Sequence, residues 1–211
     1  MTSRLRKILP EFIYYRLQLL ENYFELKNWK NKEIKVPVPH IVKQKLIESY
    51  KKKYSISVLI ETGTYMGDMI KSQLNNFIIL YSIELSQELW QEAVKRFKKY
   101  KHVTLLQGDS GEVLIELMSK IQNRAIFWLD GHYSAGITAK GKKECPIYEE
   151  LDAIFGSNID HILLIDDARL FIGEKDYPTI EELSKYILKY RNKSTIKIQD
   201  DVICVELNSV K

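Results

Sequence analysis

Cysteine and long apolar runs are scarce in this chain of 211 residues. The two cysteines, Cys145 and Cys204, have no paired spacing and no accompanying histidine motif, which argues against a disulfide framework or a structural zinc site. Nowhere do about 18 apolar residues follow one another, as a membrane-spanning helix requires. The first residues also lack the apolar core of a signal peptide. We therefore expect a cytoplasmic protein without a transmembrane segment.

Internal repeats and low-complexity tracts are absent as well. With 45% hydrophobic and 28% charged residues, the chain falls outside the disordered and fibrous classes and can bury one core. Its net charge of +4 is unevenly distributed, because residues 1–53 contain 13 Lys and Arg against 5 Asp and Glu. A basic arm can approach a membrane surface, nucleic acid or an anionic substrate. The helical spacing of the apolar residues favours instead a solvated helix pair packed on a sheet.

The order of the expected elements predicts the fold class. Apolar residues recur at three- and four-residue intervals from Pro10 onward, which predicts a helix with a face suited to covering a sheet. A second basic helix is expected over about 41–52, after an extended link that Pro37 and Pro39 impose. Residues 1–53 are therefore expected to form a basic helical extension, and residues 54–211 one α/β domain.

From Val58 the pattern changes to strands and helices in alternation. Five apolar segments, VLIET, FIILYSIEL, VTLLQGD, AIFWLD and HILLIDD, each precede a helical pattern, and TIKIQ and VICVEL close the chain. Such alternation predicts a doubly wound, Rossmann-like sheet of seven strands, mostly parallel with right-handed crossovers. The link through Asp200 and Asp201 is too short for a crossover helix, so the final strand must run antiparallel to its neighbour.

The segment VLIETGTYMG, residues 58–67, combines a buried strand with a turn that contains two glycines. In doubly wound sheets ligands bind beyond the carboxyl ends of the strands. The spacing is Glu-x-Gly-x-x-x-Gly, not Gly-x-Gly-x-x-Gly, so the turn alone is a weak signal. Glu84 ends the next strand, 21 residues after Gly63, where an acid can accept the hydroxyls of a ribose or merely precede a helix.

The motifs ETGTYMG, YSIEL, QGDS and FWLDGHY, in this order, resemble those of class I S-adenosylmethionine-dependent methyltransferases over about residues 58–207. The resemblance implies that the glycine turn approaches the methionine part of the cofactor, Glu84 holds the ribose and Asp109 faces the adenine. Ser110 is alternatively a helix cap. That family commonly has a glycine where Tyr65 stands. The cofactor residues expected on this basis are Glu61, Gly63, Thr64, Tyr65, Gly67, Glu84, Asp109, Ser110 and Asp130.

Three carboxylates are expected at the ends of the fourth and fifth strands, where Asp130, Asp166 and Asp167 follow apolar segments. Clustered carboxylates repel one another unless a cation lies between them, and hard oxygen ligands suit Mg²⁺. Asp167 can alternatively cap a helix or pair with Arg169. The pattern resembles metal-dependent, macrocin-type O-methyltransferases that act on sugars of antibiotics, in which Asp-x-Asp-x-Tyr replaces Asp130-Gly-His-Tyr.

His132 stands where that family has its general base, and imidazole can accept a hydroxyl proton at neutral pH. A lone histidine can equally be structural. Residues 134–145 are expected to form a lid over the substrate or a solvated loop. Their glycines nearly match a phosphate-binding loop, but Lys143 replaces the hydroxyl residue that would hold Mg²⁺. The catalytic and substrate residues expected are Asp130, His132, Tyr133, Lys140, Lys143 and Arg169.

The function expected from these motifs is O-methylation of a hydroxylated small molecule, with S-adenosylmethionine and Mg²⁺ as cofactors. A sugar or a phosphorylated compound is the expected acceptor, and a homodimer is compatible with the sequence. Asp130 is not followed by Pro-Pro-Tyr, which argues against methylation of nucleic-acid bases. Two alternatives stay open, a nucleotide-dependent phosphoryl-handling enzyme and a catalytically silent module that binds an adenosyl ligand.

Overall fold

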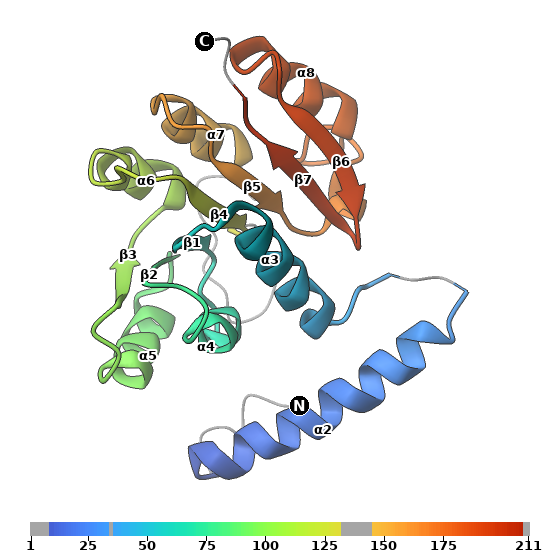
Figure 1. Cartoon of the computed structure of the whole chain (residues 1–211), viewed down its shortest axis with the longest axis vertical. Coiled ribbons are helices and arrows are strands. Elements are labelled where there is room, and N and C mark those ends of the chain that lie inside the picture. Colours follow the sequence, from blue (N-terminus) through green and yellow to red (C-terminus); the bar gives the residue numbers. More distant parts are fainter. Residues whose placement is uncertain (1–8, 34–35, 132–144, 209–211) are drawn as a thin grey trace.

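The computed structural model describes residues 9–33, 36–131 and 145–208 (Figure 1). Its helices are α2 (Glu11–Lys30), α3 (His40–Tyr54), α4 (Asp68–Gln73), α5 (Gln87–Phe97), α6 (Ser110–Met118), α7 (Ile147–Phe155) and α8 (Ile180–Tyr190), with a 3-10 turn η1 (Ala168–Leu170). Its strands are β1 (Val58–Thr62), β2 (Ile79–Glu84), β3 (Val103–Gln107), β4 (Ala125–Leu129), β5 (Ile162–Ile165), β6 (Thr195–Gln199) and β7 (Val202–Glu206).

The strands form one sheet in the order β3-β2-β1-β4-β5-β7-β6. The first five strands in this order run parallel to one another, and β7 runs antiparallel to both β5 and β6. The predicted fold class is thereby confirmed. Asp200 and Asp201 both have positive φ angles, 52° and 61°, as the two central residues of the tight hairpin turns that match strand twist do.

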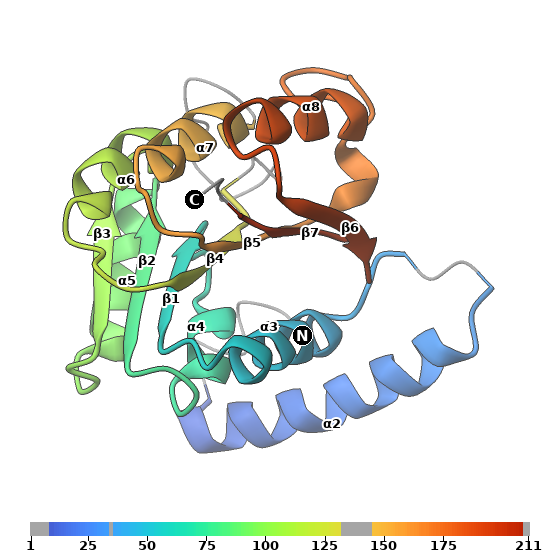
Figure 2. The ribbon, with the colours of Figure 1, turned by 45° about the horizontal axis from the view of Figure 1, so that its top comes forward.

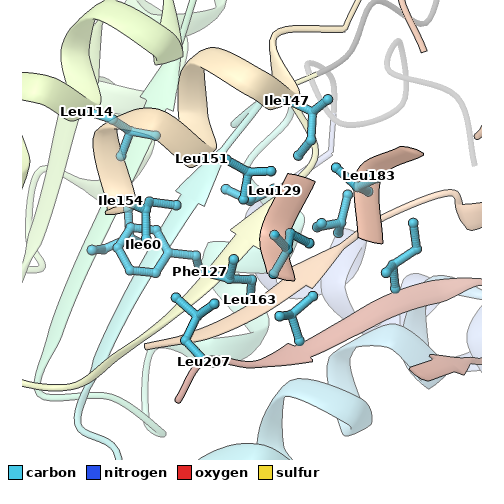
Figure 3. Close-up of a cluster of buried hydrophobic side chains, with 14 of the residues drawn as sticks. Ile60, Leu114, Phe127, Leu129, Ile147, Leu151, Ile154, Leu163, Leu183 and Leu207 are labelled. Carbon is cyan, nitrogen blue, oxygen red and sulfur yellow. The ribbon is translucent and has the colours of Figure 1, made fainter. Parts of the chain in front are cut away.

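Helices cover both faces of the sheet, with α6, α7 and α8 on one side and α3, α4 and α5 on the other (Figure 2). All residues of β1, β4 and β5 are buried, because parallel strands in the middle of such a sheet have helices on both faces. Alternate residues therefore belong to two cores. Figure 3 shows the core between the sheet and α6, α7 and α8, in which Phe127 and Leu163 pack against Leu151 and Ile154.

The second core lies between the sheet and α3, α4 and α5. Helix α3 contributes Leu46, Ile47 and Tyr50 to it, so this helix is an integral part of the α/β body. Helix α2, in contrast to α3, contributes none of its described residues to this core and lies outside α3 and α4 in Figure 2. Its Leu20 and Phe24 are 57% and 59% exposed. Of the predicted N-terminal helix pair, α3 therefore covers the sheet, whereas α2 packs outside α3 and α4.

None of the helices in the described ranges combines the length and the apolar character that crossing a bilayer takes.

Candidate functional site

A cleft of about 790 Å³ opens at the carboxyl ends of β1 and β4, between the glycine turn and helix α2. The turn and the strand ends form one wall, and the polar side of α2 forms the other. The lining residues are Tyr14, Gln18, Glu21, Asn22, Phe24, Glu25, Asn28, His40, Glu61, Gly63, Thr64, Tyr65, Met66, Asp68, Met69 and Asp130. The cleft thus includes five of the nine residues that the sequence predicted for a cofactor.

The glycine turn is tightly packed against the end of β4. Gly63 has a φ angle of 79°, and a Cβ atom added there would lie 2.2 Å from the backbone oxygen of Asp130. The backbone nitrogen of Gly63 donates to Ile83 in β2. Gly67 also has a positive φ, 72°, and begins α4. Glycine is favoured at both positions by the positive φ angles, and it is required at Gly63, where a side chain would overlap the neighbouring backbone.

Tyr65 occupies the position where the resembling family commonly has glycine, and it adopts a left-handed φ of 47°. Such a conformation is strained for a residue with a Cβ atom. The carboxylate of Glu84 holds the turn in place, since one oxygen accepts from the backbone nitrogen of Tyr65 at 2.8 Å and the other from that of Ser86 at 2.9 Å. Glu84 is buried beside the turn and does not itself line the cleft.

Glu61 is a buried acid at the floor of the cleft. Its carboxylate accepts a hydrogen bond from Ser82, whose hydroxyl lies 2.5 Å from that of Thr64. Burial raises the pKa of Glu61 well above its ordinary value, the bond from Ser82 opposes this, and the charge of Asp130 raises it further. A cation placed in the cleft would favour the ionised form of Glu61.

Asp109 and Ser110 lie at the start of α6 and are not among the residues that line this cleft. Asp109 caps the helix, accepting from the backbone nitrogen of Gly111 at 3.0 Å. The hydroxyl of Ser110 donates to the buried carboxylate of Glu150 at 2.6 Å. Asp109 lines a second cavity of about 740 Å³ between α6 and α7. The structure therefore brings Glu61, Gly63 and Asp130 together in the lining of the cleft, and Asp109 and Ser110 are not part of that lining. The hydroxyl of Ser110 nevertheless lies beside Gly131, 3.2 Å from a Cβ atom added there.

The acid pair after β5 is bound to lysine and arginine side chains. The ammonium group of Lys43, in α3, lies 2.6 Å from Asp166 and 2.8 Å from Asp167. Arg169 contacts Asp167 at 2.7 Å and also pairs with Asp201 in the β6–β7 hairpin. The alternative that Asp167 pairs with Arg169 is therefore the one observed. Arg169, predicted to bind substrate, is engaged in this network.

Burial and the neighbouring charges shift the pKa values of Lys43 and Asp166 in opposite directions. Burial alone would lower the pKa of Lys43, but Asp166 and Asp167 together raise it above its ordinary value, so the lysine is positively charged. Burial raises the pKa of Asp166 despite the opposing effect of Lys43.

The predicted Mg²⁺ site does not fit these residues. Over residues 9–33, 36–131 and 145–208, no group of three or more His, Cys, Asp or Glu side chains is arranged to hold a metal ion. Lys43 supplies the positive charge that Asp166 and Asp167 need, which sequence spacing does not reveal because Lys43 precedes them by more than a hundred residues.

Several expected residues fall outside the part of the chain that the structure describes. They are His132, Tyr133, Lys140 and Lys143, together with the phosphate-loop alternative at 136–143.

Four functional candidates were missed in the sequence: Lys43, His40, Arg96 and Glu150. Arg96, from α5, binds Asp68 at 2.8 Å and the backbone oxygen of Met66, and so braces the turn. No local motif marks any of the four. Lys43, Arg96 and Glu150 contact distant segments, and His40 lines the cleft from the start of α3.

Comparison with known proteins supports the fold and no closer relationship. No protein-family model and no curated protein matches the sequence. Among solved structures, SAH-bound methyltransferase PaMTH1 from Podospora anserina has a TM-score of 0.59 at 13% identity, covering 95% of this chain and 98% of that one. A putative caffeoyl-CoA O-methyltransferase from Staphylococcus aureus has a TM-score of 0.59 at 13% identity, covering 90% and 100%.

The O-methyltransferase TomG from Streptomyces achromogenes, involved in tomaymycin synthesis and solved with SAM, has a TM-score of 0.56 at 14% identity. The match covers 91% of this chain and 89% of that one. Identities at this level show the fold alone. The chain therefore has a Rossmann-like methyltransferase fold.

Proposed function

We propose that this chain is an S-adenosylmethionine-dependent O-methyltransferase that acts on a hydroxyl group of a small molecule. The observation that carries the proposal is the cleft, where the strained glycine turn, Glu61 and Asp130 meet at the carboxyl ends of two adjacent strands. Ligands of doubly wound sheets bind at this edge. Solved structures of the same fold that contain SAM or SAH support the choice of cofactor.

The charge of the cleft also supports S-adenosylmethionine as the cofactor. Carboxylates line both walls, among them Asp130 on one side and Glu21 and Glu25 on the other, and no Lys or Arg is found among its described lining residues. S-adenosylmethionine carries positive charge on its sulfonium and ammonium groups, so a cleft of negative potential favours it over a nucleoside triphosphate.

The opposite wall supports a hydroxylated acceptor. Gln18, Asn22 and Asn28 of α2 line the cleft, together with Tyr14 of the same helix. Amides both donate and accept hydrogen bonds, as sugar hydroxyls do. A sugar or sugar-containing acceptor is the class we propose.

The reaction follows from these parts. The acceptor oxygen attacks the methyl carbon, the carbon–sulfur bond breaks, and the electron pair stays on sulfur as S-adenosylhomocysteine forms. The hydroxyl proton passes to a base, for which we propose His132 on the sequence argument. The protein mainly supplies positioning, because the cofactor carries its own leaving group. We assign no step to a metal ion.

Calorimetry tests the cofactor assignment. We expect S-adenosylmethionine and S-adenosylhomocysteine to bind one per chain and ATP not to bind. Glu116→Gln, an exposed change in an ion pair with Lys120, should bind the cofactor as the wild type does. Tight binding of ATP with none of S-adenosylmethionine would favour the phosphoryl-handling alternative and refute the proposal.

Transfer of labelled methyl groups to a panel of sugars tests the reaction. His132→Ala should lower kcat by roughly 100-fold or more at saturating acceptor. An unchanged rate would contradict the base assignment. Cofactor binding without transfer to any hydroxylated acceptor would identify a silent binding module.

A further inference from the structure

The side chain of Lys43 lies where the sequence predicts a metal ion. It comes from α3, and only 9% of the side chain is exposed. Its ammonium group contacts one oxygen of Asp166 at 2.6 Å and one of Asp167 at 2.8 Å. A single protein cation therefore bridges the two carboxylates that follow β5.

The carboxylate oxygens that face Lys43 have further donors. The same oxygen of Asp166 accepts from the backbone nitrogen of Asp167 at 2.7 Å. The same oxygen of Asp167 accepts from Arg169 at 2.7 Å, and Arg169 continues the network to Asp201. Two positive side chains thus surround the acid pair.

Helix α3, which carries Lys43, is fixed in place by its packing. Leu46 and Ile47, on the adjoining turn of α3, are 4% and 0% exposed in the core beneath the sheet. Moving the ammonium away by shifting the helix would unpack these side chains. Mg²⁺ needs oxygen ligands at about 2.0–2.1 Å and keeps several of its waters. A divalent ion and the two protein cations would repel one another at such distances.

We infer that the ammonium group of Lys43 takes the place of a divalent metal ion at the end of β5, and that methyl transfer by this chain is independent of added metal. The second part rests on the proposed function. Transfer of a methyl group from sulfur to oxygen needs a base and alignment of the reactants, and both can be supplied without a metal.

The first experiment measures Mn²⁺ binding to the purified chain by electron paramagnetic resonance. We expect no saturable site in the wild type, and treatment with EDTA should change neither Tm nor the affinity for S-adenosylmethionine measured by calorimetry. One tightly bound Mn²⁺ per chain that is lost in Asp166→Asn would overturn the inference.

A second experiment tests whether Lys43 is the required cation. Lys43→Met should lower Tm by about 10 °C, because it leaves buried carboxylates without their partner. The double variant Lys43→Met/Asp166→Asn should recover at least half of that loss. Lys45→Met, at an exposed lysine of the same helix, is the matched control. A Lys43→Met variant as stable as this control would also overturn the inference.

The two proposals fail in different ways. If the wild type binds no S-adenosylmethionine with or without EDTA, the proposed function is wrong. The Mn²⁺ and Tm measurements need no cofactor, so they decide the role of Lys43 independently.

Discussion

At the residue scale, acids that look alike in the sequence are held in different ways. Glu61 is buried with a hydroxyl partner and a raised pKa, whereas Glu84 accepts two backbone N–H groups that hold the glycine turn. Asp166 is paired with a lysine. The partners of Glu61 and Asp166 come from other elements, so the role of each carboxylate depends on its tertiary contacts.

Gly63→Ala should abolish cofactor binding and lower the free energy of unfolding by roughly 3 kcal/mol or more. The added methyl group would overlap the backbone oxygen of Asp130, and the backbone would keep a φ of 79°. Urea denaturation and calorimetry with S-adenosylmethionine measure the two effects.

Gly173→Ala is the matched control. Gly173 has a similar φ of 83°, but its added Cβ would meet only a side-chain methyl of Thr179 at 3.0 Å. We expect a loss of roughly 1 kcal/mol and unchanged cofactor affinity. If both variants lose the same stability and both bind cofactor, the packing of the turn against β4 is not required.

His161 should make stability fall in mild acid. Its ring is fully buried, and Nδ1 accepts from the backbone nitrogen of Ala125 at 3.1 Å. Burial, followed by the charges of Arg124 and Arg191, lowers the pKa of His161 to about 4. In the unfolded chain the pKa of His161 is near 6.5. Between pH 4 and 6.5 the unfolded state therefore binds a proton on this imidazole more readily than the folded state does. The contribution of His161 to stability should therefore be constant above pH 6.5 and fall by roughly 3 kcal/mol as the pH drops to 4.

Urea denaturation of the wild type and His161→Asn across this pH range measures the effect. The quantity to compare is the difference in the free energy of unfolding between the two proteins at each pH. The raised pKa of Glu61 makes both proteins more stable as the pH falls, so its effect cancels in that difference. Parallel pH profiles would show that His161 does not contribute.

At the scale of the elements, the two N-terminal helices have different roles. Helix α3 packs into the core and carries Lys43, whereas α2 exposes much of its apolar surface and forms a wall of the cleft. Pro37 and Pro39 lie between α2, which lines the cleft, and α3, which packs into the core. Both helices have apolar residues at helical spacing, so the sequence alone did not reveal this difference.

Asn22→Arg should weaken the binding of S-adenosylmethionine roughly tenfold, since it places a positive charge in a cleft lined by carboxylates. Leu19→Arg adds the same charge on the same helix at a position that is 48% exposed and does not line the cleft. Calorimetry should give an unchanged affinity for this control. Equal weakening in both variants would mean that α2 does not contribute to the cleft in solution.

For the whole molecule, cofactor binding should raise stability by mass action. At a concentration 100 times its Kd, a ligand that binds only the folded state adds about 2.7 kcal/mol, which corresponds to a Tm increase of roughly 5–10 °C for a domain of this size. Thermal scans with S-adenosylmethionine, with ATP as the control ligand, measure this shift. An equal shift with ATP would contradict the proposed selectivity.

Much of the fold is predictable because hydrophobic periodicity is local. Strands such as β4 and β5 appear in the sequence as uninterrupted apolar segments, and the short link at Asp200 and Asp201 dictates the antiparallel hairpin. The glycine turn is equally visible. The acceptor, the homodimer and the cytoplasmic location stay predictions.

The order of the elements, the direction of the strands and the position of the glycine turn can be predicted from the sequence, because each depends on residues close together in the chain. The groups that neutralise the acids after β5, and the helix that forms the wall of the cleft, become known only from the folded structure. Lys43 and Asp166 are separated by more than a hundred residues, and their contact exists only because α3 packs beneath the sheet. Electrostatic partnership depends on distance in space, which local sequence patterns do not record.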